Sequence, residues 1–266
     1  MEIAVGSRPG VPQRGGDEAY VAEIVAPGIV LLAVAHGFGR VRDKSAAAVA
    51  TQMVRDTLRR RVRGERRDPR TALASAMSAA NGRLYANSGS TDDYVASGTS
   101  LTAALIVGDR AFVGHVGTTR AYLGREGGLN ALTVDDALGE GPARLLTRAI
   151  GTQSTLDVSL AQVRLMHGDA LVLSSGALHE FLADDEIADA LAASATSEDV
   201  TARLLAIAGI RSKEAGTVIV GRAFGELALG PVHGRRPTTR DGVVALTAMA
   251  AASLISALVL HAFLPW

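Results

Sequence analysis

The period of hydrophobic and polar positions changes along the chain, and the changes predict where strands give way to helices. Two apolar runs rich in β-forming residues, 19–26 and 28–35, are separated by a Pro-Gly pair and predict a hairpin of core strands. Residues 43–64 and 71–89 then carry apolar side chains at helical spacing among strong helix formers. A pair of strands is therefore expected to precede a pair of helices.

The second half of the chain returns to strands before it ends in short helices and a last strand. Three strands are predicted within residues 99–133, where Gly-Asp and Gly-Gly pairs mark turns, and a further hairpin within residues 163–178. Helices are predicted at 184–193 and 197–210, and a closing strand at 216–224. Because strands group with strands and helices with helices, the order favours an α+β layered sandwich over a parallel βαβ fold.

An apolar stretch follows this predicted domain. No acidic or basic side chain occurs from Val243 to Leu264, and as a helix this stretch is ~33 Å long against a hydrocarbon core of ~30 Å. Arginines precede the stretch and none follows it, so the positive-inside rule places the domain in the cytoplasm. We therefore expect a single-pass protein of the cell membrane with a C-terminal transmembrane helix at residues 242–266. The alternative is a buried or dimer-forming helix.

Composition defines the remaining organisation and excludes some classes of function. Residues 225–241 are rich in Gly, Pro and Thr without an apolar period, so they predict a flexible linker after one domain at residues 1–224. The 27 basic and 27 acidic residues balance, which argues against nucleic acid as a partner. Cysteine is absent, which excludes disulfides and thiolate metal sites, and the N-terminus lacks the pattern of a signal peptide.

Five segments carry motifs that, in this order, resemble those of a known enzyme family. They are LLAVAHGFGR (31–40), GHVGTTRAYL (114–123), LLTRAIG (145–151), GDALVLSSGAL (168–178) and EAGTVIVGRAF (214–224). They resemble the "FAVADGMGG", "HVGDSRAYL", "LTRALG", "GDLLLLCSDGL" and "DNITVVVV" motifs of the metal-dependent PPM, or type 2C, serine/threonine phosphatases. The resemblance implies a four-layer αββα sandwich. It also implies a pair of Mg²⁺ or Mn²⁺ ions between two central sheets, held mainly by aspartates, and a metal-bound water that attacks phosphoserine or phosphothreonine.

The positions where the resemblance implies metal-binding aspartates carry other residues in this chain. These positions hold Glu18, His36, Thr118, Gly176 and Glu214, and Gly37, which follows His36, is counted with them. A neutral imidazole at the bridging position offers one lone pair where two hard cations each require an oxygen. The sequence therefore predicts a degenerate site with no bound metal and no catalytic residue, although His36 could also be a strand-end residue bonded to the backbone.

These losses predict a pseudophosphatase that serves as a protein-binding or regulatory module in bacterial-type serine/threonine phosphorylation signalling. Its partner would be a phosphorylated or unphosphorylated protein. The alternative is an active metal-dependent serine/threonine phosphoprotein phosphatase, in which Glu18, His36 and Glu214 form a remodelled site for Mn²⁺, Mg²⁺ or Zn²⁺. The sequence is compatible with both interpretations, an inactive binding module and an active enzyme.

Three further features have both a functional and a structural interpretation. Arg14 is a candidate phosphate-binding residue or a solvated loop arginine. Asp135 and Asp136 resemble a segment at the rim of the family's active site, and paired aspartates are expected at the surface. The arginine-rich residues 59–70 are a candidate docking patch or a solvated helix end.

Overall fold

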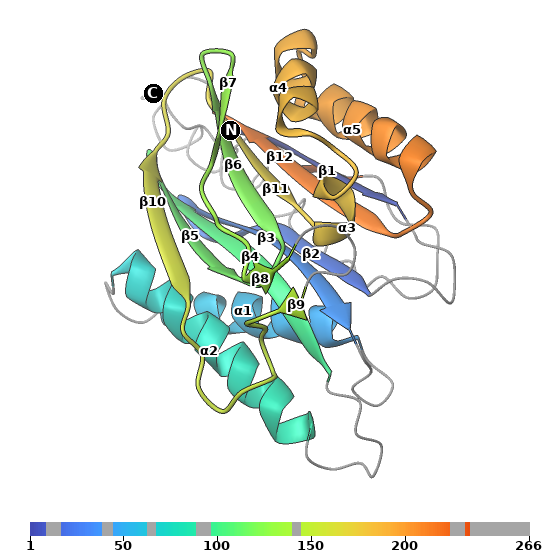
Figure 1. Ribbon diagram of the computed structural model, residues 1–266. Helices are drawn as coiled ribbons and strands as arrows, with labels where there is room; N and C mark the ends of the chain where they lie inside the picture. The colour runs from blue at the N-terminus through green and yellow to red at the C-terminus, as the bar shows by residue number, and fades with distance from the viewer. Residues whose placement is uncertain are drawn as a thin grey trace, which may run out of the picture.

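Two β-sheets pack face to face in the computed structural model, and helices cover the outer side of each (Figure 1). The structure describes residues 1–8, 17–38, 45–62, 68–88, 97–139, 145–223 and 232–234. The four-layer α+β sandwich expected from the resemblance is confirmed by this arrangement.

The first sheet has six strands and is mixed, because its edge strand runs parallel to its neighbour. In spatial order its strands are β13 (Val232–Gly234), β1 (Glu2–Arg8), β12 (Gly216–Arg222), β11 (Ala170–Ser174), β6 (Arg120–Arg125) and β7 (Gly128–Ala131). The helices on its outer face are α3 (Gly176–His179), α4 (Asp184–Ala193) and α5 (Ser197–Arg211). An apolar cluster that includes Val200, Leu204 and Val218 fills the space between these helices and the sheet.

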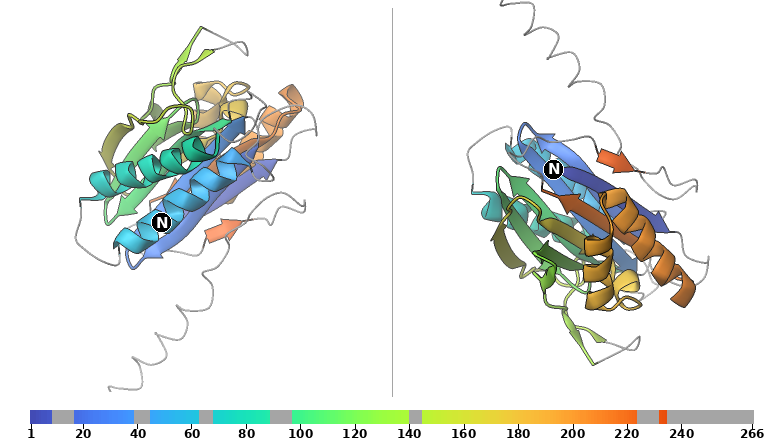
Figure 2. Two further views of the ribbon diagram at one scale, coloured as in Figure 1. Left: turned by 90° about the horizontal axis from the view of Figure 1, so that it is seen from below. Right: turned by 90° about the horizontal axis from the view of Figure 1, so that it is seen from above.

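The second sheet has five strands and carries the long helices. In spatial order its strands are β10 (Ser159–Arg164), β5 (Arg110–Val116), β4 (Gly98–Val107), β3 (Ile29–Phe38) and β2 (Glu18–Ala26). Helices α1 (Ala46–Val62) and α2 (Pro69–Ser88) lie side by side across its outer face (Figure 2). A separate two-stranded ribbon consists of β8 (Ala137–Leu138) and β9 (Leu145–Leu146).

The interior strand β3, between β2 and β4, is buried on both faces. Leu31, Ala33 and Ala35 belong to the apolar cluster under α1 and α2. The alternate residues, among them Leu32 and Val34, belong to the cluster between the two sheets. This alternation follows from the period of two in a strand, and it explains why the run reads as continuously apolar in the sequence.

Most predicted elements are confirmed, and the differences concern pairing. Residues 163–178 do not form a hairpin, because β10 pairs with β5 of one sheet whereas β11 lies in the other sheet between β12 and β6. The segment between them therefore passes from one sheet to the other. Residues 99–133 hold four strands rather than three, since the Gly-Gly turn closes a β6–β7 hairpin. The sequence patterns also missed β1 and the single-turn α3.

The C-terminal predictions fall mainly outside the described residues. Within the predicted linker 225–241, residues 232–234 form β13 beside β1. No helix in the described part of the chain is long and apolar enough to cross a membrane. The predicted transmembrane helix at 242–266 lies outside the described residues, so it remains a prediction.

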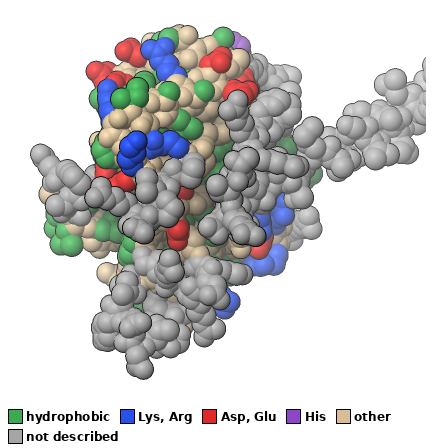
Figure 3. All heavy atoms as spheres, turned by 90° about the vertical axis from the view of Figure 1, so that its right-hand side faces the viewer, with side chains coloured by type: hydrophobic (Ala, Val, Ile, Leu, Met, Phe, Trp, Pro, Cys, Tyr) green, Lys and Arg blue, Asp and Glu red, His purple; other side chains and the backbone are tan. Residues whose placement is uncertain are grey.

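Charge is mixed on the described surface. On the face shown in Figure 3, acidic and basic side chains are interspersed among apolar and neutral ones. This agrees with the balance of 27 basic and 27 acidic residues in the sequence.

Gly117, directly after β5, is required by its conformation and its surroundings. Its φ is +101°, and a Cβ there would lie 2.5 Å from the Cβ and 2.7 Å from the Cα of Ser100. Gly108, in the β4–β5 turn, also has a positive φ of +59°, but a Cβ there would have no neighbour within 4 Å. The two glycines therefore separate backbone strain from steric overlap.

We predict that Gly117→Ala lowers the free energy of unfolding by about 3 kcal/mol, because backbone strain and overlap with Ser100 add. Gly108→Ala is the matched control and should cost only about 1 kcal/mol, since strain acts there alone. Urea denaturation of both variants measures the difference. Equal losses for the two variants would contradict the close packing of Gly117 on Ser100.

Candidate functional site

The two residues that open the candidate site are paired across the β2–β3 ladder. Glu18 and His36 are direct partners in the antiparallel register. His36 lies two residues after Val34, which faces the other sheet, so alternation directs His36 to the same side. Its Nδ1 lies 2.7 Å from Oε1 of Glu18. The side chains are 22% and 7% exposed respectively, so the pair is largely withdrawn from water.

The surroundings of His36 favour its protonated form. Burial lowers the pKa of His36, but the hydrogen bond with Glu18 and the charges of Glu18, Glu214 and Glu180 outweigh burial and raise the pKa. Glu214 precedes β12 and Glu180 follows α3, so the field at His36 comes from both sheets. The structure thus brings three of the predicted site residues, Glu18, His36 and Glu214, into electrostatic reach of one another.

The second oxygen of Glu18 has a different environment from the first. Oε2 is buried and has no hydrogen-bond partner among the described residues. An unpaired buried carboxylate oxygen is costly, so this atom is the polar group of the pair with unused capacity to bind a donor or a cation.

Gly37, near the end of β3, lies where the start of α1 approaches the strand closely. Its amide donates a 2.7 Å hydrogen bond to the carbonyl of Asp17. A Cβ at Gly37 would lie 3.0 Å from the backbone nitrogen of Ala47, at the start of α1. The glycine therefore lets the helix approach the end of β3, and it supplies no side-chain ligand.

Thr118 and Gly176 contact each other, and Thr118 is bonded to Ser100, the partner of His36 in the β3–β4 ladder. The amide of Thr118 donates to Oγ of Ser100 at 3.0 Å, and its Oγ1 lies 3.3 Å from the same atom. A Cβ at Gly176 would lie 3.1 Å from Oγ1 of Thr118. The threonine hydroxyl thus occupies the space into which a side chain at position 176 would extend.

Asp135 is mostly withdrawn from water in an ion pair, instead of being exposed at the surface as expected. Its side chain is 11% exposed and accepts two hydrogen bonds from Arg120, at 2.8 and 2.9 Å. Burial raises the pKa of Asp135, but hydrogen bonds from His179 and Arg120 outweigh burial and hold the pKa well below its usual range. The same network reaches Tyr122, whose pKa burial raises to about 12.

Asp136 is also buried, and it ties the rim to the site. Its side chain is 9% exposed and accepts hydrogen bonds from the Gly117 amide at 2.8 Å and from Arg148 at 2.5 Å. The Asp136 amide donates back to the Gly117 carbonyl at 2.8 Å. The surface expectation for both aspartates is therefore wrong, because each has an arginine partner that compensates its burial.

Arg8 is a structural residue that the sequence patterns did not identify. Its guanidinium donates to the carbonyls of Gly209, Ser212 and Glu214, at 3.3, 2.6 and 2.7 Å. These bonds fasten the end of α5 and the loop that carries Glu214 to the end of β1. The pairing is not apparent in the sequence because more than 200 positions separate the partners. Arg14, the candidate phosphate-binding residue, lies outside the described residues.

The site as a whole combines the Glu18–His36 pair, the carboxylates of Glu180 and Glu214 whose charges act on His36, and neutral groups. Across the ranges that the structure describes, no group of three or more His, Asp or Glu side chains has the geometry to hold a metal ion. Glu18 and His36 satisfy each other through one oxygen, and Thr118 with Gly176 contributes a hydroxyl but no carboxylate. Such an arrangement can donate hydrogen bonds to a group bound at the edge between the sheets, or accept hydrogen bonds from it.

We predict that the His36 imidazole titrates above its usual pKa of about 6.5 in an NMR pH titration. The pair with Glu18 then stabilises the fold fully below about pH 6.5, and this contribution is lost as the pH rises through the raised pKa. Glu18→Gln should lower the midpoint of His36, because the main partner of the imidazolium is removed.

His115 is the control for this titration. Burial lowers the pKa of His115, despite opposing charges and a hydrogen bond to the Val134 carbonyl. Its midpoint should lie below the usual value and should not respond to Glu18→Gln. A His36 midpoint that is unchanged in the variant would contradict the ion pair.

Sequence comparisons find bacterial serine/threonine phosphatases that are similar to this chain. Residues 29–137 match the family model described as "Protein phosphatase 2C". The serine/threonine protein phosphatase PstP of Mycobacterium tuberculosis is 31% identical over 194 residues, which cover 67% of this chain and 37% of PstP. A putative protein phosphatase 2C-type of Streptococcus pyogenes serotype M6 is 28% identical over 203 residues, covering 69% of this chain and 81% of the relative. The chain thus matches little more than a third of the length of the mycobacterial relative.

Solved structures show the same fold. The crystal structure of the M. tuberculosis phosphatase PstP/Ppp superposes with a TM-score of 0.70 at 25% identity, over 84% of this chain and 98% of that one. The catalytic domain of PstP in complex with two manganese ions gives a TM-score of 0.68 at 27% identity, over 82% and 96% of the two chains. From its fold, its motifs and these similarities, the chain carries a phosphatase domain of the protein phosphatase 2C family.

Proposed function

We propose that this domain is a pseudophosphatase that acts as a protein-binding or regulatory module in serine/threonine phosphorylation signalling. The observation that carries the proposal is the ion pair between His36 and Glu18, 2.7 Å long, at the two positions where the family resemblance implies metal-binding aspartates. The proposal rests on which ligand atoms this chain supplies at those positions.

The donor set does not fit a pair of hard divalent cations. Such ions require several anionic oxygens, whereas His36 presents an imidazole, which offers a single lone pair when neutral. Its Nδ1 is already paired with Oε1 of Glu18 at 2.7 Å. Thr118 adds only a neutral hydroxyl, and its contact with Gly176 fills the neighbouring space.

Hydrogen bonds and ion pairs, and not metal ligands, connect the loops around the site to the rest of the domain. Asp136 holds the Gly117 turn, Asp135 pairs with Arg120, and Arg8 fastens the Glu214 loop. These contacts would hold the loops around the site in place without a metal. The relatives are described as serine/threonine protein phosphatases, so the partner proposed here is a phosphorylated or unphosphorylated protein of that signalling system.

One observation favours an active enzyme as the second candidate function. The buried Oε2 of Glu18 has no hydrogen-bond partner among the described residues, which is the environment of a ligand atom awaiting a cation. In that case Glu18 and Glu214, with deprotonated His36, would hold a single Mn²⁺, Mg²⁺ or Zn²⁺ ion, which would supply Lewis-acid chemistry when bound. The two candidates therefore differ in whether the cation at this site is a proton or a metal.

We predict that calorimetric titration of the full-length chain with Mn²⁺ gives no saturable binding at micromolar concentrations, and that the chain does not hydrolyse p-nitrophenyl phosphate above a metal-free blank. The triple substitution His36→Asp, Thr118→Asp and Gly176→Asp restores carboxylates and should gain Mn²⁺ binding. Manganese-dependent turnover by the unsubstituted chain that is lost in His36→Ala would establish the alternative instead.

We further propose that residues 242–266 tether the domain to the membrane. The basis is the uncharged apolar stretch from Val243 to Leu264 and the arginines that precede it. Deletion of residues 241–266 should move the protein from the membrane fraction to the supernatant after ultracentrifugation of cell extracts. A full-length chain already found in the supernatant would overturn the tether.

A further inference from the structure

We infer that the outer face of the α1–α2 layer binds an acidic segment of a partner protein. This surface is the outer side of α1 and α2, which faces away from the site between the sheets. Binding there is therefore independent of whether that site holds a metal. The surface contains an open groove of about 730 Å³, hereafter the α2 groove. Its lining residues are Arg61, Asp68, Arg70, Thr71, Ala74, Ser75, Ser78, Ala79 and Leu160.

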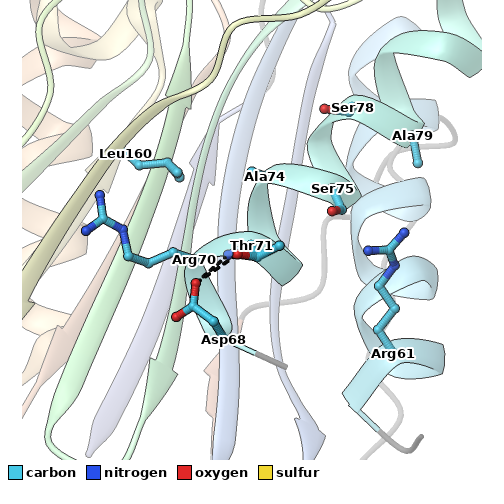
Figure 4. Close-up of a pocket in the computed structure, with 9 residues that line it drawn as sticks. All are labelled: Arg61, Asp68, Arg70, Thr71, Ala74, Ser75, Ser78, Ala79 and Leu160. Carbon is cyan, nitrogen blue, oxygen red and sulfur yellow. Dashed lines mark hydrogen bonds between the residues drawn. The ribbon is translucent and has the colours of Figure 1, made fainter. Parts of the chain in front are cut away.

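Two arginines flank the α2 groove from different elements. Arg61 is in the last turn of α1, and Arg70 is in the first turn of α2. Figure 4 shows the Arg70 side chain extending toward Leu160 of β10 and the Arg61 guanidinium beside Ser75 and Ala79. Among the residues that the structure describes, neither guanidinium forms an ion pair, although Arg70 lies in the field of Asp68.

Two other arginines of α1 differ from Arg61 in having acidic partners. Arg55 and Arg59 face Glu23 of β2, at 4.0 and 3.1 Å, and Arg55 also contacts Asp56 at 2.9 Å. Arg60 donates a hydrogen bond to the hydroxyl of Thr57 at 3.2 Å. Within the basic stretch 59–70, Arg59 is therefore compensated inside the domain, whereas Arg61 and Arg70 line the groove.

The acidic residue of the groove is already engaged. Asp68 accepts hydrogen bonds from the amide and the hydroxyl of Thr71, at 3.1 and 2.9 Å, and these bonds lower its pKa. It thus caps the start of α2, and because the charge of Arg70 also lowers its pKa, it offsets part of the positive charge of Arg70. The net charge of the groove is positive, with two arginines against one aspartate.

The floor of the groove admits a peptide backbone. Ala74, Ser75, Ser78 and Ala79 are small side chains on the exposed face of α2, so an extended or helical segment can approach closely between the arginines. The hydroxyls of Ser75 and Ser78 make no hydrogen bond to a described residue and can donate to carboxylates. Spaced guanidiniums above a narrow floor suit carboxylates distributed along a peptide, whereas a membrane or a nucleic acid would need a broad basic face.

The test measures binding of a fluorescein-labelled peptide of twelve residues, rich in Glu, to the full-length chain by fluorescence anisotropy. We expect the double substitution Arg61→Glu and Arg70→Glu to weaken binding about tenfold, because attraction becomes repulsion at both edges. Raising NaCl from 50 to 500 mM should weaken binding by the unsubstituted chain, since exposed charges are screened. The milder pair Arg61→Gln and Arg70→Gln should give an intermediate loss.

Arg83→Glu is the matched control, because Arg83 is an exposed arginine of α2 that does not line the groove. This variant should change the affinity less than about twofold. Peptide binding that is unaffected by the groove substitutions, or equally weakened by Arg83→Glu, would overturn the inference. Equal groove-dependent binding of phosphatidylserine vesicles or single-stranded DNA would also overturn it, since the groove would then not be specific for an acidic peptide. These outcomes leave the proposed loss of metal chemistry untouched.

Discussion

The double burial of β3 is the constraint on which the geometry of this domain depends. One set of alternate side chains packs under α1 and α2, and the other set packs against the second sheet. A shift of one residue in register would exchange the two sets, so the strand has one acceptable position between β2 and β4. That position places His36 opposite Glu18 on the side that faces the other sheet.

Polar interactions then hold the loops that surround this pair. Asp135 and Asp136 are adjacent in sequence but pair with different arginines, Arg120 and Arg148. Buried ion pairs gain little net stability over apolar packing, yet removing one partner leaves an uncompensated charge and is costly. These pairs therefore specify loop positions more than they add to the overall free energy of unfolding. Arg8 has the same role for the loop that precedes β12.

The two proposals concern separate surfaces and follow from different physical properties. At the edge between the sheets, one oxygen of Glu18 is paired with the His36 imidazole, whereas its second oxygen has no hydrogen-bond partner among the described residues. On the outer face of α2, Arg61 and Arg70 line the groove, and Asp68 is the one acidic residue among the described residues that line it. A phosphatase-like domain with both properties would retain the fold of the family while recognition replaces hydrolysis as its activity.

The sequence by itself determined the local elements and the family resemblance. The hairpin of β2 and β3, helices α1, α2, α4 and α5, and the closing strand β12 all follow from periodicity, because each signal lies within one short stretch of chain. The motifs placed Glu18, His36, Thr118, Gly176 and Glu214 in a common region. The structure pairs Glu18 with His36, brings Glu214 within electrostatic reach of His36, and places Thr118 in contact with Gly176.

Only the tertiary structure decided which strands pair and which charges are compensated. β10 and β11 are neighbours in sequence but belong to different sheets, because their partners β5 and β12 are remote along the chain. The same holds for Asp135 and Asp136, which look like surface residues until Arg120 and Arg148 are placed beside them, and for Arg55 and Arg61, which differ only in their partners. Periodicity reports the environment of a residue along its own element, whereas pairing across sheets and between charges depends on contacts that the order of residues does not encode locally.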